Sequence, residues 1–131
     1  MISREDVQSW LDRLEGGSLD VRELEQNLWL VRSREGAEVV VHYAPPVVIL
    51  RIRVMELPAN EPRRSELFRQ LLELNARELI HGSYGIEGDH IVLTDALELA
   101  DLDFEEFEAS FDSITLALAT HLGALAPYRE G

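Results

Sequence analysis

Residues 67–125 contain the feature that most limits what this chain can fold into. An apolar helix over residues 67–76 is followed by two short extended runs, at 83–87 and 90–99. A glycine–aspartate pair between these runs is typical of a tight hairpin turn. A long amphipathic helix then begins at Asp103. A helix, a hairpin and a second helix in one compact run indicate an α+β fold.

The first half of the chain is predicted to form one helix and three strands. Ser3 and Asp6 have the spacing of a capping box, which predicts a helix over residues 4–15. The last of the three strands alternates apolar and polar residues, as in an antiparallel sheet with one solvated face. Residues 18–27 are compatible with a loop or with a short helical turn. The three strands are predicted at residues 28–34, 37–44 and 47–57.

The helix predicted over residues 62–79 is apolar on two sides, and a helix of that kind is usually buried on two sides. The second side is compatible with a subunit interface or with a place deep in the core of the same chain. The first set of apolar positions is Leu67, Leu71 and Leu74, and the second is Phe68, Leu72 and Leu79.

The helix that begins at Asp103 carries one continuous apolar stripe, which predicts that it packs along the sheet. Asp103 and Glu106 again have the spacing of a capping box. The whole chain, residues 1–131, is predicted to be a single domain of the type helix–three strands–helix–two strands–helix, with an antiparallel sheet packed by helices. The stripe consists of Phe104, Phe107, Phe111, Ile114, Leu118, Leu122 and Leu125.

The composition favours a soluble protein of a reducing compartment. The chain has 131 residues and no cysteine, so it has no disulfide and no thiolate metal site. Its polar, acidic first residues are unlike a signal peptide. No apolar run approaches the ~18 residues of a membrane span. We therefore expect a cytoplasmic protein that does not bind membranes.

The chain is strongly acidic, and this limits its partners. Its formal net charge is −13, and all 12 basic residues are arginines. Such a charge repels a phosphate backbone, so direct binding of nucleic acid is not expected. A basic protein surface would instead be attracted. The alternative is that the charge only keeps the protein soluble.

No pattern in the sequence indicates catalysis, a cofactor or a metal. The four histidines lie on separate predicted elements without metal-ligand spacing, so we expect them to be exposed or singly hydrogen-bonded. Three glycines, Gly82, Gly85 and Gly88, fit neither a P-loop nor a dinucleotide fingerprint. No pair of carboxylates is singled out among the 25 acidic residues. An enzyme is therefore the less favoured class.

Four residues are candidates for contact with a partner. Trp10 and Trp29 are large aromatic residues, which often anchor interfaces and also fill cores; Trp10 lies on the only apolar stripe of its helix, which favours the core. Arg51 and Arg53 lie on the polar face of the third predicted strand. These two arginines place positive charge on the solvated side of the sheet.

The second half of the chain resembles a known family. Its apolar and glycine positions over residues 71–76, 82–89, 91–93 and 97–102 resemble those of the YbjN-like family. They are also similar to those of the class I type III secretion chaperones, which include the Tir chaperone group. The match covers residues 67–120, and the N-terminal half agrees in the order of its elements.

The resemblance implies a homodimer with the second helix near the two-fold axis, and it makes Leu67, Leu71 and Leu74 candidate dimer contacts. Secretion chaperones of this shape are small, acidic, cytosolic and non-catalytic, and they bind an unfolded stretch of a client along apolar patches. YbjN-like proteins are linked to stress responses and regulation. Neither family supplies catalytic residues.

The sequence thus predicts a non-enzymatic, homodimeric protein-binding module with a chaperone-like, adaptor or stress-regulator role. Its expected partners are a second copy of itself and an unidentified client protein. The alternative is an acidic regulator that binds the basic surface of a nucleic-acid-binding protein.

Overall fold

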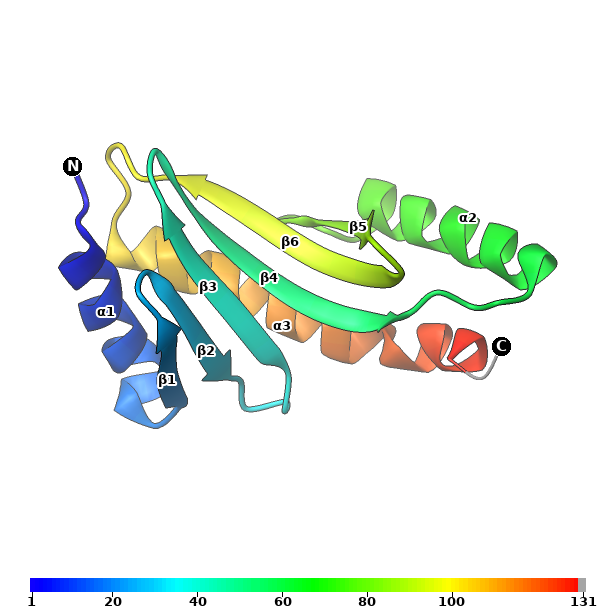
Figure 1. The fold of residues 1–131 in the computed structure, drawn as a ribbon, viewed down its shortest axis with the longest axis horizontal. Helices are drawn as coiled ribbons and strands as arrows, with labels where there is room; N and C mark the ends of the chain where they lie inside the picture. The colour runs from blue at the N-terminus through cyan, green and yellow to red at the C-terminus, as the bar shows by residue number, and fades with distance from the viewer. Residues whose placement is uncertain (130–131) are drawn as a thin grey trace.

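The computed structural model describes residues 1–129, which form an α+β structure. Within these residues, three α-helices pack with a six-stranded sheet, and two short 3-10 helices follow α1 and α3 (Figure 1). The elements in chain order are α1 (Arg4–Arg13), η1 (Leu14–Gly17), β1 (Asp20–Glu25), β2 (Leu28–Arg32), β3 (Glu38–Ala44), β4 (Val47–Glu56), α2 (Glu61–Arg77), β5 (Ser83–Glu87), β6 (His90–Glu98), α3 (Phe104–Leu125) and η2 (Ala126–Tyr128).

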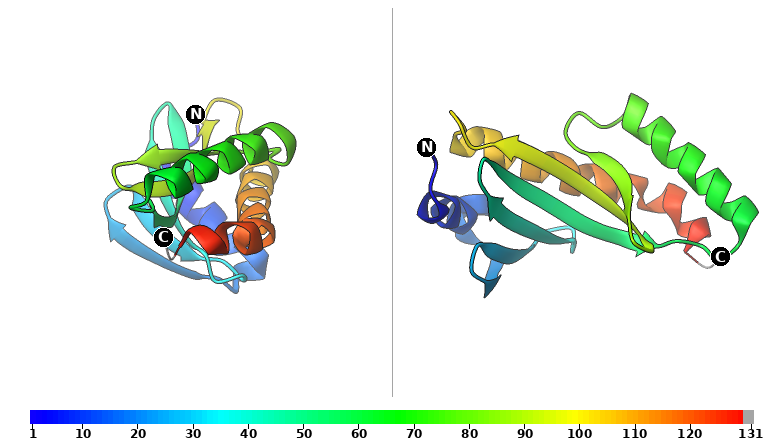
Figure 2. Two further views of the ribbon diagram at one scale, coloured as in Figure 1. Left: turned by 90° about the vertical axis from the view of Figure 1, so that its right-hand side faces the viewer. Right: turned by 45° about the horizontal axis from the view of Figure 1, so that its top comes forward.

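The sheet has the strand order β1-β2-β3-β4-β6-β5, and every neighbouring pair is antiparallel. α3 runs behind the strands in Figure 1, with α1 near the N-terminal end. α2 lies beyond the other end of the sheet, next to β5 and the C-terminal turn (Figure 2). The predicted fold class is therefore confirmed.

One face of the sheet packs against α1 and α3 and forms the core. Successive side chains of a strand point to opposite faces, so every second residue of β2, β3 and β4 enters this core. Phe107, Phe111 and Ile114 of α3 are buried there, as the predicted stripe requires. The buried strand residues include Trp29, Val31, Val39, Val41, Val48, Leu50 and Ile52.

The structure adds a strand that the sequence analysis left open. Residues 18–27 were predicted as a loop or a short helical turn, but Asp20–Glu25 forms β1 at the edge of the sheet. Val21 is the only half-buried residue of this strand, and the other five are exposed. An edge strand with little buried surface has no apolar alternation that could reveal it in a sequence.

The predicted helix starts are confirmed in atomic detail. Ser3 and Asp6 form a capping box at α1, and Asp103 and Glu106 form one at α3. The Asn60 side chain accepts a hydrogen bond from the Arg63 amide at the start of α2. None of the helices in residues 1–129 is long and apolar enough to cross a membrane.

Candidate binding surface

Within residues 1–129, no helix covers the outer face of β2, β3 and β4. In Figure 1 no helix crosses β2, β3 or β4 on the side toward the viewer. Four apolar side chains, Leu28, Leu30, Val40 and Ile49, lie on this face and are half-buried. They lie side by side because Leu30 pairs with Val40, and Ile49 lies two residues from the pairing partner of Val40. We call these four residues the open sheet face.

Two arginines of β4 lie beside the open sheet face. Arg51 forms an ion pair with Glu87 of β5, with 3.3 Å between nitrogen and oxygen. Arg53 is exposed, and no ion pair of Arg53 occurs within residues 1–129. The structure thus brings the two arginines predicted as partner contacts to the same uncovered face. A role for them in binding stays a prediction.

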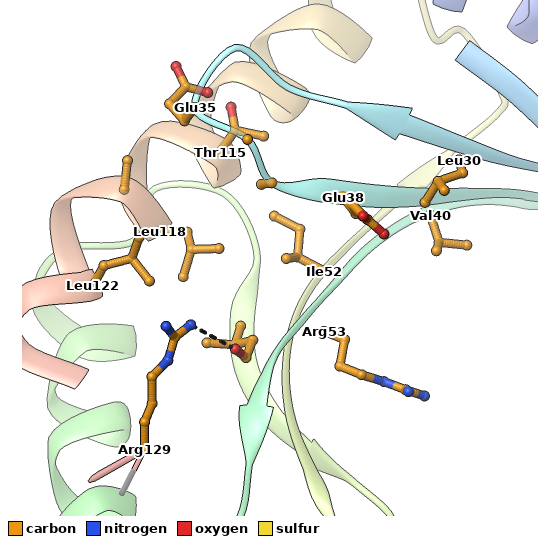
Figure 3. Close-up of a pocket in the computed structure, with 14 residues that line it drawn as sticks. Leu30, Glu35, Glu38, Val40, Ile52, Arg53, Thr115, Leu118, Leu122 and Arg129 are labelled. Carbon is orange, nitrogen blue, oxygen red and sulfur yellow. Dashed lines mark hydrogen bonds between the residues drawn. The ribbon is translucent and has the colours of Figure 1, made fainter. Parts of the chain in front are cut away.

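A pocket of about 520 Å³ opens at one side of this face, where β3 begins and β4 continues past its pairing with β3 (Figure 3). Its apolar lining includes Ile52 of β4, Leu118 and Leu122 of α3, and also Leu30 and Val40 of the open sheet face. Glu35 and Glu38 lie on the side of the β2–β3 turn, and Arg53 and Arg129 lie on the opposite side. We call this pocket the notch, because it connects the outer face of the sheet with α3.

The two candidate tryptophans lie in the core. Trp29 is fully buried, and its indole nitrogen donates to the Gln8 side-chain oxygen at 2.7 Å. Trp10 is 9% exposed and packs on Phe107, with 5.6 Å between ring centroids. Both rings therefore fill space between α1, α3 and the sheet. A role in partner binding stays a prediction for both, and their positions leave little exposed surface for it.

Leu67, Leu71 and Leu74, the candidate dimer contacts, are buried within one chain, with exposed fractions of 0%, 5% and 8%. Their part in a dimer stays a prediction. The outer side of α2 instead presents Leu72, which is 67% exposed. Ile80, eight residues further on, is 88% exposed. Of the second apolar set, Phe68 and Leu79 are half-buried against the core, and only Leu72 is exposed.

His121 corrects the expectation that the histidines are exposed or singly hydrogen-bonded. It is 4% exposed, its Nδ1 lies 2.7 Å from the Tyr84 hydroxyl, and its Nε2 lies 3.3 Å from Glu78. Burial, together with Glu78, raises the pKa of Tyr84, which keeps the hydroxyl protonated as a donor. His121 therefore connects α3 with β5 and with the end of α2.

Chemically reactive arrangements are scarce in residues 1–129. No three histidine, aspartate or glutamate side chains there could hold a metal ion together. Burial and the negative charges of Glu15, Glu108 and Glu35 raise the pKa of Asp112 to about 6. Such a shift occurs in active sites and also where like charges crowd. Neither Asp112 nor Glu15 lines the notch.

Sequence reasoning did not find the residues that form the notch as a group. Leu118 and Leu122 were assigned to the stripe facing the sheet, but Leu122 is 38% exposed and lines the notch. Arg129 follows the last helix and belongs to no apolar or charged pattern that would have predicted a role for it. The periodicity of apolar residues does not reveal where one strand extends beyond the strand that it pairs with.

The comparisons with known proteins identify the family. The CesT_Tir_1 family model matches residues 2–130, almost the whole chain. The chain belongs to the CesT_Tir_1 family. This is a family of type III secretion chaperones, so the resemblance seen in the sequence is confirmed. No curated protein matches the chain significantly.

Solved structures share the fold of this CesT_Tir_1 member at low sequence identity. A chain of the heterodimeric ExoU–SpcU complex from the type III secretion system of Pseudomonas aeruginosa has a TM-score of 0.69 at 17% identity, covering 95% of this chain and 98% of that one. YbjN from E. coli, described as a putative transcription regulator, has a TM-score of 0.66 at 12% identity, with 94% and 93% covered. A chain of the complex between the Yersinia pestis type III secretion chaperone SycH and a stable fragment of YscM2 has a TM-score of 0.64 at 14% identity, with 90% and 98% covered.

Proposed function

We propose that this protein is a non-enzymatic, homodimeric module that binds a segment of another protein in the cytoplasm. Its role would be that of a chaperone, an adaptor or a stress regulator. The observation that carries the proposal is the open sheet face, an apolar surface left without a helix. Exposed apolar patches of this kind often mark interaction sites.

The physical basis is the burial of apolar surface. Leu28, Leu30, Val40 and Ile49 are only half-buried in one chain, although they lie in the middle of the sheet. Covering them with a client segment would contribute roughly 25 cal/mol for each Å² of apolar area removed from water. An unfolded segment presents apolar side chains for this purpose. The client would in turn be protected from aggregation.

The family and the similar structures support a protein partner. One similar structure is SycH in complex with a stable fragment of YscM2, and another is the heterodimer of ExoU and SpcU. Membership of a chaperone family also points away from enzymatic activity. These relationships support, for this chain, a client protein rather than a small-molecule substrate.

The outer side of α2 supports self-association. Leu72 and Ala76 are exposed one helical turn apart, and Ile80 is exposed in the connection that follows α2. A row of ion pairs, in which Glu73 contacts both Arg69 and Arg77 at 3.6–3.7 Å, lies beside them. A second copy that packs on this side would cover the exposed Leu72. Leu67, Leu71 and Leu74 would then hold α2 in place from the core side.

Affinity purification of the tagged protein from its native cells tests the proposal. The variant Leu30→Asp/Val40→Asp places two charges on the open sheet face, where half-buried side chains should tolerate them without loss of the fold. We expect proteins that co-purify with the wild type to be absent from this variant, provided that circular dichroism shows an unchanged fold. Equal recovery with both proteins would contradict binding by this face, and recovery of no protein with the wild type would contradict the function.

A second candidate function has one structural observation in its favour. Glu15, Glu35 and Glu108 lie close enough to Asp112 to raise its pKa, so negative charge is concentrated on this side of α3. This concentration supports the alternative of an acidic regulator that binds a basic surface on a nucleic-acid-binding protein. Binding of that kind should weaken steeply with added salt. An affinity that is independent of salt would contradict it.

A further inference from the structure

α2 stands apart from the other two helices, and a few directional contacts determine where it lies. It is found beyond the end of the sheet, next to β5 and the end of α3 (Figure 2). Its inner side packs on the core through Leu67, Leu71 and Leu74. Apolar packing has no preferred direction, so the polar contacts at the two ends of α2 are what fix its position.

The end of α2 is held by β5 and α3. The Asn75 side chain accepts a hydrogen bond from the Tyr84 amide at 2.7 Å and donates one to the Tyr84 carbonyl oxygen at 3.2 Å. Glu78, one residue after the helix, lies 3.3 Å from Nε2 of His121. These contacts connect the last turn of α2 with the sheet and with α3.

The start of α2 is held by the end of the chain. The residues from 126 to 129 comprise η2 and Arg129, and we call them the strap. In the first turn of α2, the Arg63 guanidinium donates a hydrogen bond to the Pro127 carbonyl oxygen. The same guanidinium lies over the Tyr128 ring, with 5.5 Å between its carbon and the ring centroid. Tyr128 itself packs against the core.

The strap is in turn tied to the rest of the fold. It follows α3 directly, and the Arg129 guanidinium donates to the Val54 carbonyl oxygen of β4 at 3.2 Å (Figure 3). Within the part of the chain that the structure describes, Arg63 makes the only side-chain hydrogen bond from the first two turns of α2 to another element. The strap therefore links α3 and β4 to the start of α2.

The contact between Arg63 and the strap is of a kind that can open without unfolding the core. Arg63 and Tyr128 are both half-buried, so water competes for the cation–π contact and weakens it. The net contribution of a single hydrogen bond is also small, because water replaces the partner when the bond breaks. Opening of the strap is therefore a local event at one end of α2.

We propose that the strap holds the first half of α2 in place, and that opening of the strap weakens the contact between two copies through the outer side of α2. This inference rests on the proposed function, because it takes the outer side of α2 as the surface that meets a second copy. A mobile helix must become ordered when that copy binds, and the ordering opposes association. The strap therefore strengthens self-association by keeping α2 ordered beforehand.

Amide hydrogen exchange measured by mass spectrometry tests the strap. Arg63→Ala removes the donor and the cation, whereas Tyr128→Leu removes the ring and keeps an apolar side chain. Each should speed exchange at residues 64–72 about tenfold by making local opening easier. The double variant should exchange about as fast as the faster single variant, because both changes break one contact. The measurement uses the Leu72→Glu background, so that a dimer cannot protect α2.

Arg4→Ala is the matched control. Arg4 also lies in the first turn of a helix, with its guanidinium carbon 5.1 Å from the centroid of the Trp29 ring, but this helix is α1. Arg4→Ala should leave exchange at residues 64–72 within about twofold of its value without this change, because α1 has no part in the strap.

Light scattering over a dilution series measures the dissociation constant of the dimer, without the Leu72 substitution. Arg63→Ala and Tyr128→Leu should each raise this constant about tenfold, because α2 must then be ordered on association. Arg4→Ala should change it by less than about twofold, since it leaves α2 in place.

Unchanged exchange at residues 64–72 in both strap variants would overturn the proposal, and so would effects that simply add in the double variant. Faster exchange with an unchanged dissociation constant would overturn the link between the strap and self-association. Failure of the proposed dimer would appear separately, as a wild type that is monomeric at every concentration. Exchange in that monomer would still decide whether the strap holds α2.

Discussion

At the scale of single residues, the structure shows where this chain accepts unfavourable charge. Asp112 lies half-buried on α3, and its burial and its acidic neighbours raise its pKa to about 6. The pair of Tyr84 and His121 is different, because each buried polar atom there has a partner. The acidic groups around Asp112 thus lower the free energy of unfolding, whereas the contacts of His121 with Tyr84 and Glu78 connect α3 with β5 and the end of α2.

The Asp112 carboxyl should make stability depend on pH in a defined direction. Between its ordinary pKa of 3.8 and its folded value of about 6, the folded state binds a proton more tightly than the unfolded state. The carboxyl therefore lowers the free energy of unfolding above pH 6 and relieves this cost as the pH falls. Asp112→Asn should stabilise the protein at pH 7.5 by on the order of 1 kcal/mol, allowing for solvent screening.

Urea denaturation at several pH values measures this effect. The gain from Asp112→Asn should shrink below pH 6 and vanish below the ordinary pKa of aspartate. Asp20→Asn, at an exposed position of β1, is the matched control and should give no comparable gain. A gain of the same size at every pH would show that the amide acts by packing and not by removing a charge.

At the scale of elements, strand lengths and connections determine where surface stays open. β4 extends past its pairing with β3, and the notch lies there, lined in part by the exposed Leu122. Between α2 and β5 the chain makes a close turn instead. There Gly82 has φ +77°, and a Cβ atom at this position would lie 2.7 Å from the Thr94 carbonyl oxygen. This glycine is what lets the connection pass next to β6.

Gly82→Ala should therefore destabilise the protein by about 2 kcal/mol or more, because alanine is strained at positive φ and its methyl group meets backbone. Gly85 is the control, since a Cβ there has no atom within 4 Å and its φ is not positive. Gly85→Ala should change the free energy of unfolding by less than about 0.5 kcal/mol. Thermal or urea unfolding compares the two. Equal effects would mean that the close approach at Gly82 relaxes without cost.

At the scale of the whole molecule, one side of α2 stabilises the fold, and we expect the other side to contact a second copy. Leu71 is 5% exposed and belongs to the core, whereas Leu72 is 67% exposed. Adjacent residues of the same type thus serve different purposes. The net charge of −13 keeps copies apart in general, so a dimer needs a specific apolar contact to overcome it.

We expect Leu72→Glu to give a folded monomer and Leu71→Glu to give an unstable or aggregated protein, because only the second buries a charge. Size-exclusion chromatography with light scattering measures the mass, and circular dichroism measures the fold. The wild type should be a dimer at micromolar concentration. A Leu72→Glu protein that stays dimeric would exclude the outer side of α2 from the interface, and a monomeric wild type would contradict the dimer itself.

The sequence alone determined most of the elements of this protein. Capping boxes at Ser3 and Asp103 predicted where two helices begin, and both are present. Apolar periodicity predicted the strands from Leu28 onward and the stripe of α3, because burial requires side chains on one side of an element. The resemblance of residues 67–120 predicted the family, and the family model confirmed it.

Only the tertiary structure decided which apolar residues stay exposed. The sequence did not predict β1, because an edge strand that buries little apolar surface has no apolar alternation. Whether Trp10 and Trp29 lie in the core depended on which elements pack over them. The two apolar sets of α2 look alike in sequence, yet the first is buried in the core, whereas the second is only partly covered and leaves Leu72 exposed. The notch exists because two neighbouring strands differ in length. Local apolar patterns show how much surface an element must bury. Which other element covers that surface depends on contacts between residues far apart in the chain.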